Sequence, residues 1–145
     1  MEQHALRQAN MAIAERYLQA INDWDFDVKR ELLAPDVIFE MRWAPPGFPR
    51  RIDGVEAVME FLAPLPEAIV TEGLHDIRLE TLHSDAGQVV AFYKSDMKMV
   101  RPVEYKNDYI TCFTIRDGRI VRFCEYFDPI PLVVAFGGSV VPPSP

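Results

Sequence analysis

The chain has 145 residues and carries 15 Lys and Arg against 22 Asp and Glu, which gives a formal net charge of -7. This length suffices for one ordinary domain, so residues 1–145 are predicted to fold as a single α+β domain. The acidic balance argues against nucleic acid and against membrane surfaces as partners, because like charges repel. No apolar run approaches the roughly 18 residues of a membrane span, and a cytoplasmic location is the expectation.

The cysteines and histidines form no pattern typical of a metal site or a disulfide. Cys112 and Cys124 lie in apolar, strand-like segments, and the three histidines do not cluster with them at the spacing of metal ligands. The sequence therefore predicts no metal, no disulfide and no cofactor.

In chain order, the first elements are two helices. Apolar side chains recur every three or four residues over 5–22, which indicates a helix packed on a flat surface. Asp25 or Asp27 is placed to cap a second, short helix through Leu33, and a proline two residues later marks its end.

A strand and a third helix follow. Residues 36–43 read as a strand that a Pro-Pro-Gly run ends abruptly. Asp53, with Glu56 three places on, resembles a capping box at the start of a helix. That helix is expected to reach Leu62, and two prolines close it.

The pattern then changes to strands separated by turn-forming residues. Helices first and an antiparallel meander afterwards is the order of an α+β fold with the helices gathered on one face of the sheet. Residues 138–145 are rich in proline and are expected to be a frayed end. The four predicted strands cover about 74–83, 88–100, 104–115 and 119–128.

Turn chemistry predicts which side chains share a face of this sheet. Read as a three-residue loop, 116–118 places Tyr109 opposite Glu125. A four-residue loop from Val100 to Val103 then places Lys94 opposite Tyr109. Opposed residues project from the same side. This face carries two polar rows, Lys94, Tyr109, Glu125 and Asp96, Asn107, Phe127, and below them two apolar rows, Phe92, Thr111, Phe123 and Val90, Phe113, Val121.

Glu125 is the candidate proton shuttle, because aromatic neighbours raise the pKa of a carboxyl by removing its water. Lys94 would favour the charged form and Asp96 would oppose it, so the net direction stays open. The alternative is a solvated salt bridge between Lys94 and Glu125 that contributes about 0–1 kcal/mol.

Two further predictions concern the pocket wall and the opposite face. Tyr17 lies on the inner stripe of the first helix, and Met41, Trp43 and Phe61 are candidates for the pocket mouth, although plain core packing explains each equally well. The opposite face is too apolar for open water and predicts a homodimer. Its residues are Tyr93, Ser95, Met97, Ile110, Cys112, Cys124 and Tyr126.

The chain resembles the SnoaL-like, or nuclear transport factor 2-like, superfamily. The resemblance rests on the early Trp24-Asp25, on Asp53-Gly54 before a helix, and on the stretches 105–109, 117–120 and 125–129. It implies a cone-shaped roll, with a curved, mixed and mostly antiparallel sheet and about three N-terminal helices packed on its concave face. Reactions in the superfamily are diverse, so the fold alone does not decide the function.

The resemblance also suggests site residues. Limonene-epoxide hydrolases have a basic residue and a carboxylate two apart on one strand and a carboxylate on the last strand, and Lys94, Asp96 and Glu125 occupy similar places. Phe39 and Met41 stand where those enzymes hold the attacking water, which argues against epoxide hydrolysis. Phenazine-biosynthesis proteins carry a catalytic Glu that Glu125 resembles. The steroid isomerases' base falls near Met41, so their mechanism is disfavoured.

The leading hypothesis is a cofactor-free enzyme that acts on a small hydrophobic, oxygenated molecule. Glu125 would be the general acid or base, with Asp96 as partner carboxylate and Lys94 stabilising charge. Isomerisation, cyclisation, dehydration and hydrolysis all fit; the alternative is a non-catalytic binding or dimerisation protein. Predicted substrate contacts are Asn107, Tyr109, Tyr17, Met41, Trp43, Phe61, Phe92, Thr111, Phe123 and Phe127.

Overall fold

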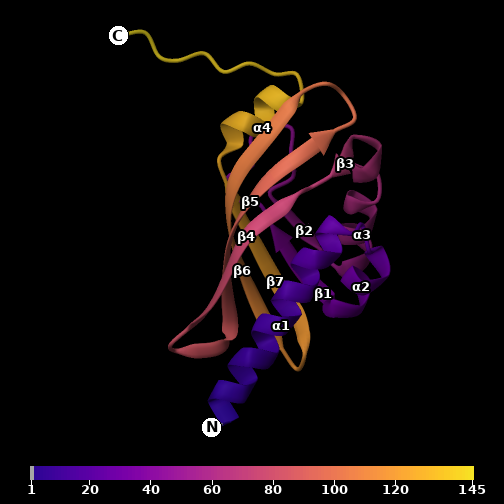
Figure 1. The fold of residues 1–145 in the computed structure, drawn as a ribbon, viewed down its shortest axis with the longest axis vertical. Helices are drawn as coiled ribbons and strands as arrows, with labels where there is room; N and C mark the ends of the chain where they lie inside the picture. Colours follow the sequence, from indigo (N-terminus) through magenta and orange to yellow (C-terminus); the bar gives the residue numbers. More distant parts are fainter. Residues whose placement is uncertain (1) are drawn as a thin grey trace.

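The computed structural model describes residues 2–145, in which four α-helices accompany a strongly curved seven-stranded sheet (Figure 1). None of the helices in these residues is long and apolar enough to cross a membrane. The helices are α1 Glu2–Asn22, α2 Phe26–Leu32, α3 Val55–Leu62 and α4 Pro129–Ala135, and a 3-10 turn spans Leu65–Glu67. The strands are β1 Leu33–Glu40, β2 Arg51–Asp53, β3 Ile69–Thr71, β4 Leu74–Leu82, β5 Asp85–Met99, β6 Glu104–Arg116 and β7 Arg119–Phe127.

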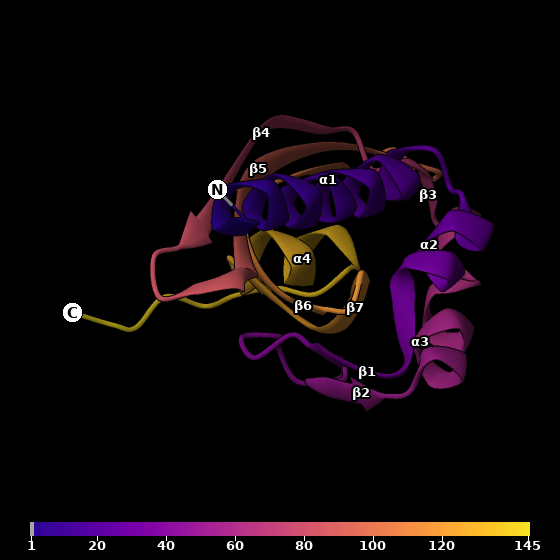
Figure 2. The same cartoon turned by 90° about the horizontal axis from the view of Figure 1, so that it is seen from below.

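The sheet is mixed and mostly antiparallel. Its strand order is β2-β1-β7-β6-β5-β3, with β4 also paired to β5, and the β1–β7 pair is parallel while the other pairs are antiparallel. The sheet curls around α1 and α4, and α2 and α3 close the side between α1 and β1 (Figure 2). The predicted α+β cone is confirmed.

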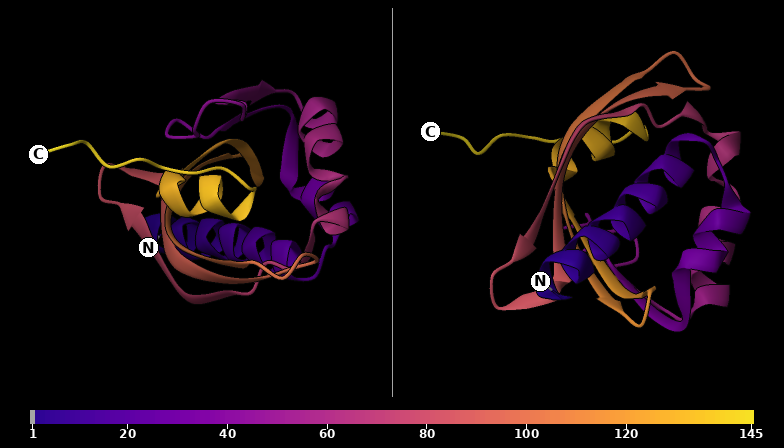
Figure 3. Two further views of the ribbon diagram at one scale, coloured as in Figure 1. Left: turned by 90° about the horizontal axis from the view of Figure 1, so that it is seen from above. Right: turned by 60° about the horizontal axis from the view of Figure 1, so that its bottom comes forward.

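Helix α1 is fixed on the concave face by side chains at its middle and at its C-terminal end. Asn10 Nδ2 donates to the Ala86 carbonyl at 2.9 Å, and Asn22 exchanges two hydrogen bonds with the Leu74 backbone at 2.7 and 3.1 Å. Between them the helix presents the buried Tyr17 to the sheet. The helix therefore crosses the concave face at a fixed tilt (Figure 3).

An aromatic core, formed by Tyr17, Phe39, Phe113 and Phe123, fills the middle of the cone. Phe39 stacks on Phe123 with ring centroids 4.3 Å apart, and Tyr17 meets the Phe123 and Phe113 rings at 5.2 and 5.9 Å. Each residue is at most 3% exposed. Such pairs add roughly 0.5–1.5 kcal/mol each to the free energy of burial.

The β6–β7 turn differs from the prediction, but the β7 side chains around Glu125 point to the predicted sides of the sheet. Asp117 and Gly118 both have positive φ, of 50° and 77°, so they form a two-residue turn with Arg116 opposite Arg119. A bulge at Val121 then moves the pairing by one more residue, which puts Thr111 opposite Glu125. The total error is two residues. Because side chains alternate with period two, Glu125 still faces inward with the aromatic residues.

The predicted β5–β6 pairing is wrong by one residue, and this reverses every side chain of β5. Tyr93, not Lys94, lies opposite Tyr109, because the β5–β6 loop takes one more residue than predicted. Lys94 and Asp96 are consequently exposed on the outer face, where the Lys94 ammonium lies 3.7 Å from the Asp108 carboxylate. Tyr93, Ser95 and Met97, expected outside, point inward, and Phe92, expected inside, lies outside.

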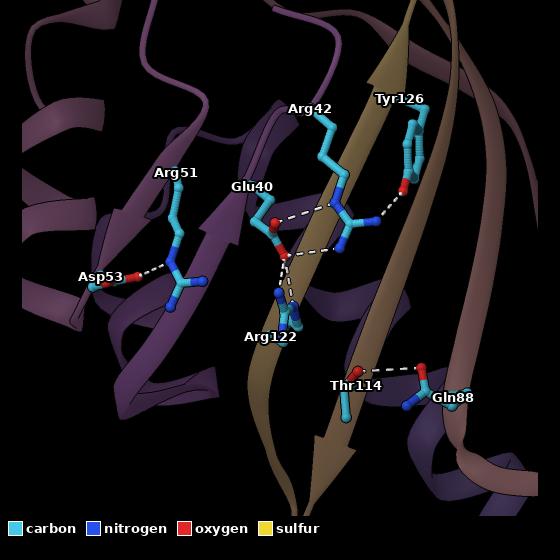
Figure 4. A network of polar contacts seen from close by, with 8 residues as sticks. All are labelled: Glu40, Arg42, Arg51, Asp53, Gln88, Thr114, Arg122 and Tyr126. Atoms are coloured by element: carbon cyan, nitrogen blue, oxygen red, sulfur yellow. Dashed lines mark hydrogen bonds and ion pairs between the residues drawn. The ribbon is translucent and has the colours of Figure 1, made fainter.

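The parallel β1–β7 pair is held on the outer face by a polar network (Figure 4). Glu40 accepts hydrogen bonds from Arg42 at 3.2 Å and from Arg122 at 2.6 Å, and Arg42 donates to the Tyr126 hydroxyl at 3.0 Å. Burial alone would raise the pKa of Glu40, but these hydrogen bonds lower it below its ordinary value. The network is a structural tie and lies on the face away from the cone interior.

Some of the local features were not predicted, whereas the Asp25 cap and the irregular C-terminal segment were. Helix α4 follows directly on β7, where Asp128 caps it by accepting from the Ile130 amide at 3.0 Å. Helix α3 starts at a Gly54 N-cap without a side-chain hydrogen bond, so the expected capping box is absent, whereas Asp25 does cap α2. Residues 138–145 have no helix or strand, are exposed, and extend away from the body (Figure 1).

Candidate functional site

A cavity of about 140 Å³ lies between the aromatic core and α4. Cavities near this size take a single small ring, as the benzene-binding cavity of another protein illustrates. Side chains from the four helices and from strands on both sides of the cone line it, and most are apolar. The apolar lining includes Ile21, Phe39, Met41, Phe48, Phe61, Leu62, Leu65, Ile69, Leu74, Met97, Phe127, Leu132 and Phe136.

Three acidic or basic side chains interrupt this apolar wall: Lys29, Glu72 and Glu125. Glu125 comes from β7 and stands between two inward aromatic residues of the same strand, Phe123 and Phe127. Because residues two apart on a strand point to the same side, the Glu125 carboxyl lies inside the cone with these two rings. A carboxyl in such surroundings loses most of its hydration.

Glu72 reaches the cavity from the short connection between β3 and β4. The next residue, Gly73, has φ +60°, and a Cβ there would lie 2.4 Å from the Asp96 carbonyl oxygen. The Gly73 carbonyl accepts from the Asp96 amide at 3.1 Å. Only glycine fits this tight approach to β5, and the turn it makes directs Glu72 into the pocket.

Lys29 is the least solvent-exposed of the three. It lies on α2 and is only 2% exposed. Its Nζ lies 5.1 Å from the Phe26 ring centroid and 5.7 Å from that of Trp24. Among residues 2–145 no carboxylate lies within 4.0 Å of this nitrogen.

Burial and mutual charge shift the pKa values of all three groups. Burial raises the pKa of Glu125 to about 8, with a further rise from Glu72 and a smaller opposing effect of Lys29. Burial raises the pKa of Glu72 to about 7, against the attraction of Lys29. Burial lowers the pKa of Lys29, which the two carboxyls partly restore. At neutral pH the pocket thus holds one mostly neutral carboxyl and one that is about half ionised.

Tyrosines line the side of the cavity formed by β5 and β6. Tyr93 and Tyr109 stack with centroids 5.0 Å apart, and their hydroxyls bond to Thr111 at 2.7 Å and Ser95 at 3.1 Å. Burial raises the pKa of Tyr93 and of Tyr109 far above the ordinary value. These phenols therefore stay neutral and act as hydrogen-bonding groups.

Some of the side chains predicted for the site do reach the cavity. Six of them line it: Tyr17, Met41, Phe61, Tyr109, Glu125 and Phe127. Thr111 and Phe123 are buried just beneath, at 1% exposure each, where Thr111 holds the Tyr93 hydroxyl.

Other predicted residues lie elsewhere. Lys94 and Asp96 are exposed on the outer face, as the β5 register requires. Phe92 lies there too, with the Arg78 guanidinium 4.3 Å above its ring. Trp43 is 58% exposed and packs edge-on against Tyr126 at 4.9 Å. The basic and acidic pair that resembles the one in limonene-epoxide hydrolases is therefore absent from the pocket.

Asn107 is buried but supports α4 instead of lining the cavity. Its amide nitrogen donates to the Tyr105 hydroxyl and to the Asp128 carbonyl, both at 2.9 Å. Its oxygen accepts from the Asp128 backbone amide at 3.3 Å. Asn107 thus holds the first residue of the segment that leads into the helix above the pocket.

Lys29 and Glu72 were missed by the sequence reasoning. Lys29 lies three residues before Leu32 on the short helix α2, and both side chains are buried. Glu72 lies in the irregular segment before β4, where its only sequence signal is the adjacent glycine. Among the described residues, no group of three or more His, Cys, Asp or Glu is arranged to hold a metal ion.

Comparison with known proteins agrees with this architecture. The family model of the SnoaL-like domain matches residues 14–123. The uncharacterized protein YesE of Bacillus subtilis is 33% identical over 112 residues, which cover 75% of this chain and 74% of that protein.

Two solved structures have closely similar folds. A candidate isomerase of Bacillus subtilis superimposes with a TM-score of 0.84 at 26% identity, covering 91% of this chain and 95% of its own. A phenazine biosynthesis-related protein of Pseudomonas aeruginosa superimposes with a TM-score of 0.82 at 19% identity, covering 97% of this chain and 88% of its own. At that identity the second match establishes the fold alone.

Proposed function

The chain belongs to the family of SnoaL-like domains, and on that premise we propose that it is a cofactor-free acid–base enzyme for a small, largely apolar molecule with an oxygen function. The observation that supports this most is Glu125, a carboxyl in an apolar pocket whose pKa is raised to about 8. A group with a pKa near the working pH both donates and accepts protons efficiently. The cavity has room for about one ring of the substrate.

In this proposal Glu125 in its neutral form gives its proton to a carbonyl, hydroxyl or ether oxygen of the substrate. In its ionised form it removes a proton from a carbon next to a carbonyl, and the raised pKa makes it a stronger base than an ordinary carboxylate. The Tyr93 and Tyr109 hydroxyls supply neutral hydrogen bonds nearby. Isomerisation, cyclisation, dehydration and hydrolysis all draw on these two steps.

The second candidate is a binding protein of the same fold that performs no reaction. An apolar pocket supports this function equally well, because binding requires only the cavity. The two proposals differ in what Glu125 does to a bound ligand. A binding protein holds the ligand unchanged, whereas an acid–base enzyme exchanges protons with it.

Proton exchange is measurable without the natural substrate. Single-ring ketones such as cyclohexanone and cyclohexenone are incubated with the protein in heavy water, and deuterium entry next to the carbonyl is followed by NMR. The enzyme is expected to accelerate exchange, with a rate that rises as Glu125 ionises toward pH 8. Glu125→Gln is expected to lower that rate by about 100-fold or more.

The matched control is Glu60→Gln, the same change at an exposed residue of α3. It is expected to keep the wild-type rate. Ketones that bind to both the wild-type protein and Glu125→Gln, with equal and uncatalysed exchange, would favour the binding protein over the enzyme.

A further inference from the structure

Among the described residues, Lys29 is the one cationic side chain that lines the pocket. The residue is only 2% exposed, and within residues 2–145 its ammonium has no carboxylate at ion-pair distance. The faces of Phe26 and Trp24 are its nearest support, and a ring face stabilises a cation less than a paired anion does. An ammonium has three donors and needs acceptors.

We propose that the ligand of this pocket is a small ring compound with one negative charge, a carboxylate or an acidic enol, whose anionic oxygen binds Lys29. This assignment rests on the function proposed above and names its substrate class. The ring occupies the apolar cavity, and the anionic group supplies the partner that the ammonium lacks. The reacting part of the ring then lies toward Glu125.

Ionised carboxyls repel an incoming anion, and Glu72, about half ionised at pH 7, opposes the binding of an anion to Lys29. Glu72 and Glu125 face it from the β3–β4 connection and from β7, both beyond ion-pair distance. Helices α1, α3 and α4 and strands β1 and β3 contribute no other charged side chain to the lining. The remaining titratable groups are the neutral phenols of Tyr17, Tyr93, Tyr105 and Tyr109.

Binding of an anion is therefore coupled to a proton. An anion near Glu72 raises the pKa of that carboxyl further, because like charges disfavour ionisation. Glu72 has a pKa of about 7, so it is about half ionised at pH 7 and becomes protonated when the anion enters. The expected uptake is about half a proton per ligand at pH 7, and close to none at pH 5.5, where Glu72 is already protonated.

Benzoate is the probe, and benzyl alcohol and benzamide are its neutral counterparts of the same ring size. Isothermal titration in two buffers of different ionisation enthalpy gives both the affinity and the proton uptake. The wild-type protein is expected to bind benzoate more tightly than either neutral probe, with uptake at pH 7 only. This measurement does not depend on any variant folding.

Lys29→Met is expected to weaken benzoate binding by about 10- to 100-fold and to leave the neutral probes within about threefold. Glu72→Gln is expected to keep benzoate affinity at pH 7 or increase it, while reducing the proton uptake. Lys98→Met, an exposed lysine of β5, is the matched control and changes neither quantity. Equal affinity for benzoate and benzyl alcohol, or no proton uptake, would overturn the assignment.

These results separate from those that test the acid–base function. Benzoate binding that depends on Lys29, together with ketone exchange that ignores Glu125, leaves an anion-binding pocket without catalysis. Glu125-dependent exchange together with no preference for benzoate leaves an enzyme for neutral substrates and removes Lys29 from substrate recognition.

Discussion

Replacing Glu125 with glutamine is expected to make the protein less sensitive to rising pH. Glu125 has a folded-state pKa of about 8, well above that of an exposed glutamate near 4.3. Between these values the unfolded chain has lost the proton that the folded chain keeps. The folded state binds more protons in this window, so its free energy of unfolding falls as pH rises.

The size of the effect follows from the same two pKa values. One proton contributes about 1.4 kcal/mol per pH unit, so the window from pH 5 to pH 8 gives about 4 kcal/mol from Glu125 alone. The whole free energy of unfolding of a domain is typically about 5–15 kcal/mol. A loss of this size is easily measured.

Urea unfolding at pH 5, 6, 7 and 8 tests this prediction. The free energy of unfolding of the wild-type protein is expected to fall steadily over this range. For Glu125→Gln the fall per pH unit is expected to be smaller by about 1.4 kcal/mol, the contribution of one proton. Glu60→Gln, at an exposed site, is expected to follow the wild-type profile. Parallel profiles for the wild-type protein and Glu125→Gln would mean that the carboxyl is solvated, and the acid–base proposal would lose its basis.

Four further predictions follow from the site and its surroundings. Glu72→Gln is expected to lower the pKa of Glu125, because the charge of Glu72 is one cause of the raised pKa. Carbon NMR titration of the Glu125 carboxyl measures this pKa, and an unchanged titration midpoint would contradict the prediction. Asn107→Ala is expected to cost about 1–3 kcal/mol in urea unfolding and to speed hydrogen exchange in α4, because it removes the hydrogen bonds that hold the start of that helix. Lys94→Met is expected to change stability by less than about 1 kcal/mol and to leave benzoate affinity intact, since a surface ion pair is weak. The homodimer through the outer face remains a prediction: Trp43→Glu is expected to yield monomers in light scattering, and a wild-type protein that is itself monomeric would refute it.

The fold was predictable because its signals are local and repeated. The stripe of α1, the alternation along β6 and β7 and the turn residues at Asp117-Gly118 each indicate one element independently. The inward direction of Glu125 survived an error in the turn because the bulge restored the parity of β7.

The site was less predictable because it depends on single-residue counts and on irregular backbone. One extra residue in the β5–β6 loop exchanged Lys94 for Tyr93 at the pocket, and no sequence pattern distinguishes the two loop lengths. Glu72 enters from a connection without periodicity, through a glycine whose need appears only when β5 lies against it. Lys29 is buried on a seven-residue helix, too short for its apolar side to stand out.

The aromatic core also has an evolutionary consequence. Tyr17, Phe113 and Phe123 join helix and sheet below the cavity, so much of the cohesion of the molecule does not rely on the rest of the pocket wall. Met41 and Phe61, which border the cavity, are then open to exchange for side chains of similar volume at modest cost. A scaffold arranged in this way acquires new substrates through substitutions at cavity positions such as Met41 and Phe61, while the aromatic core continues to specify the fold.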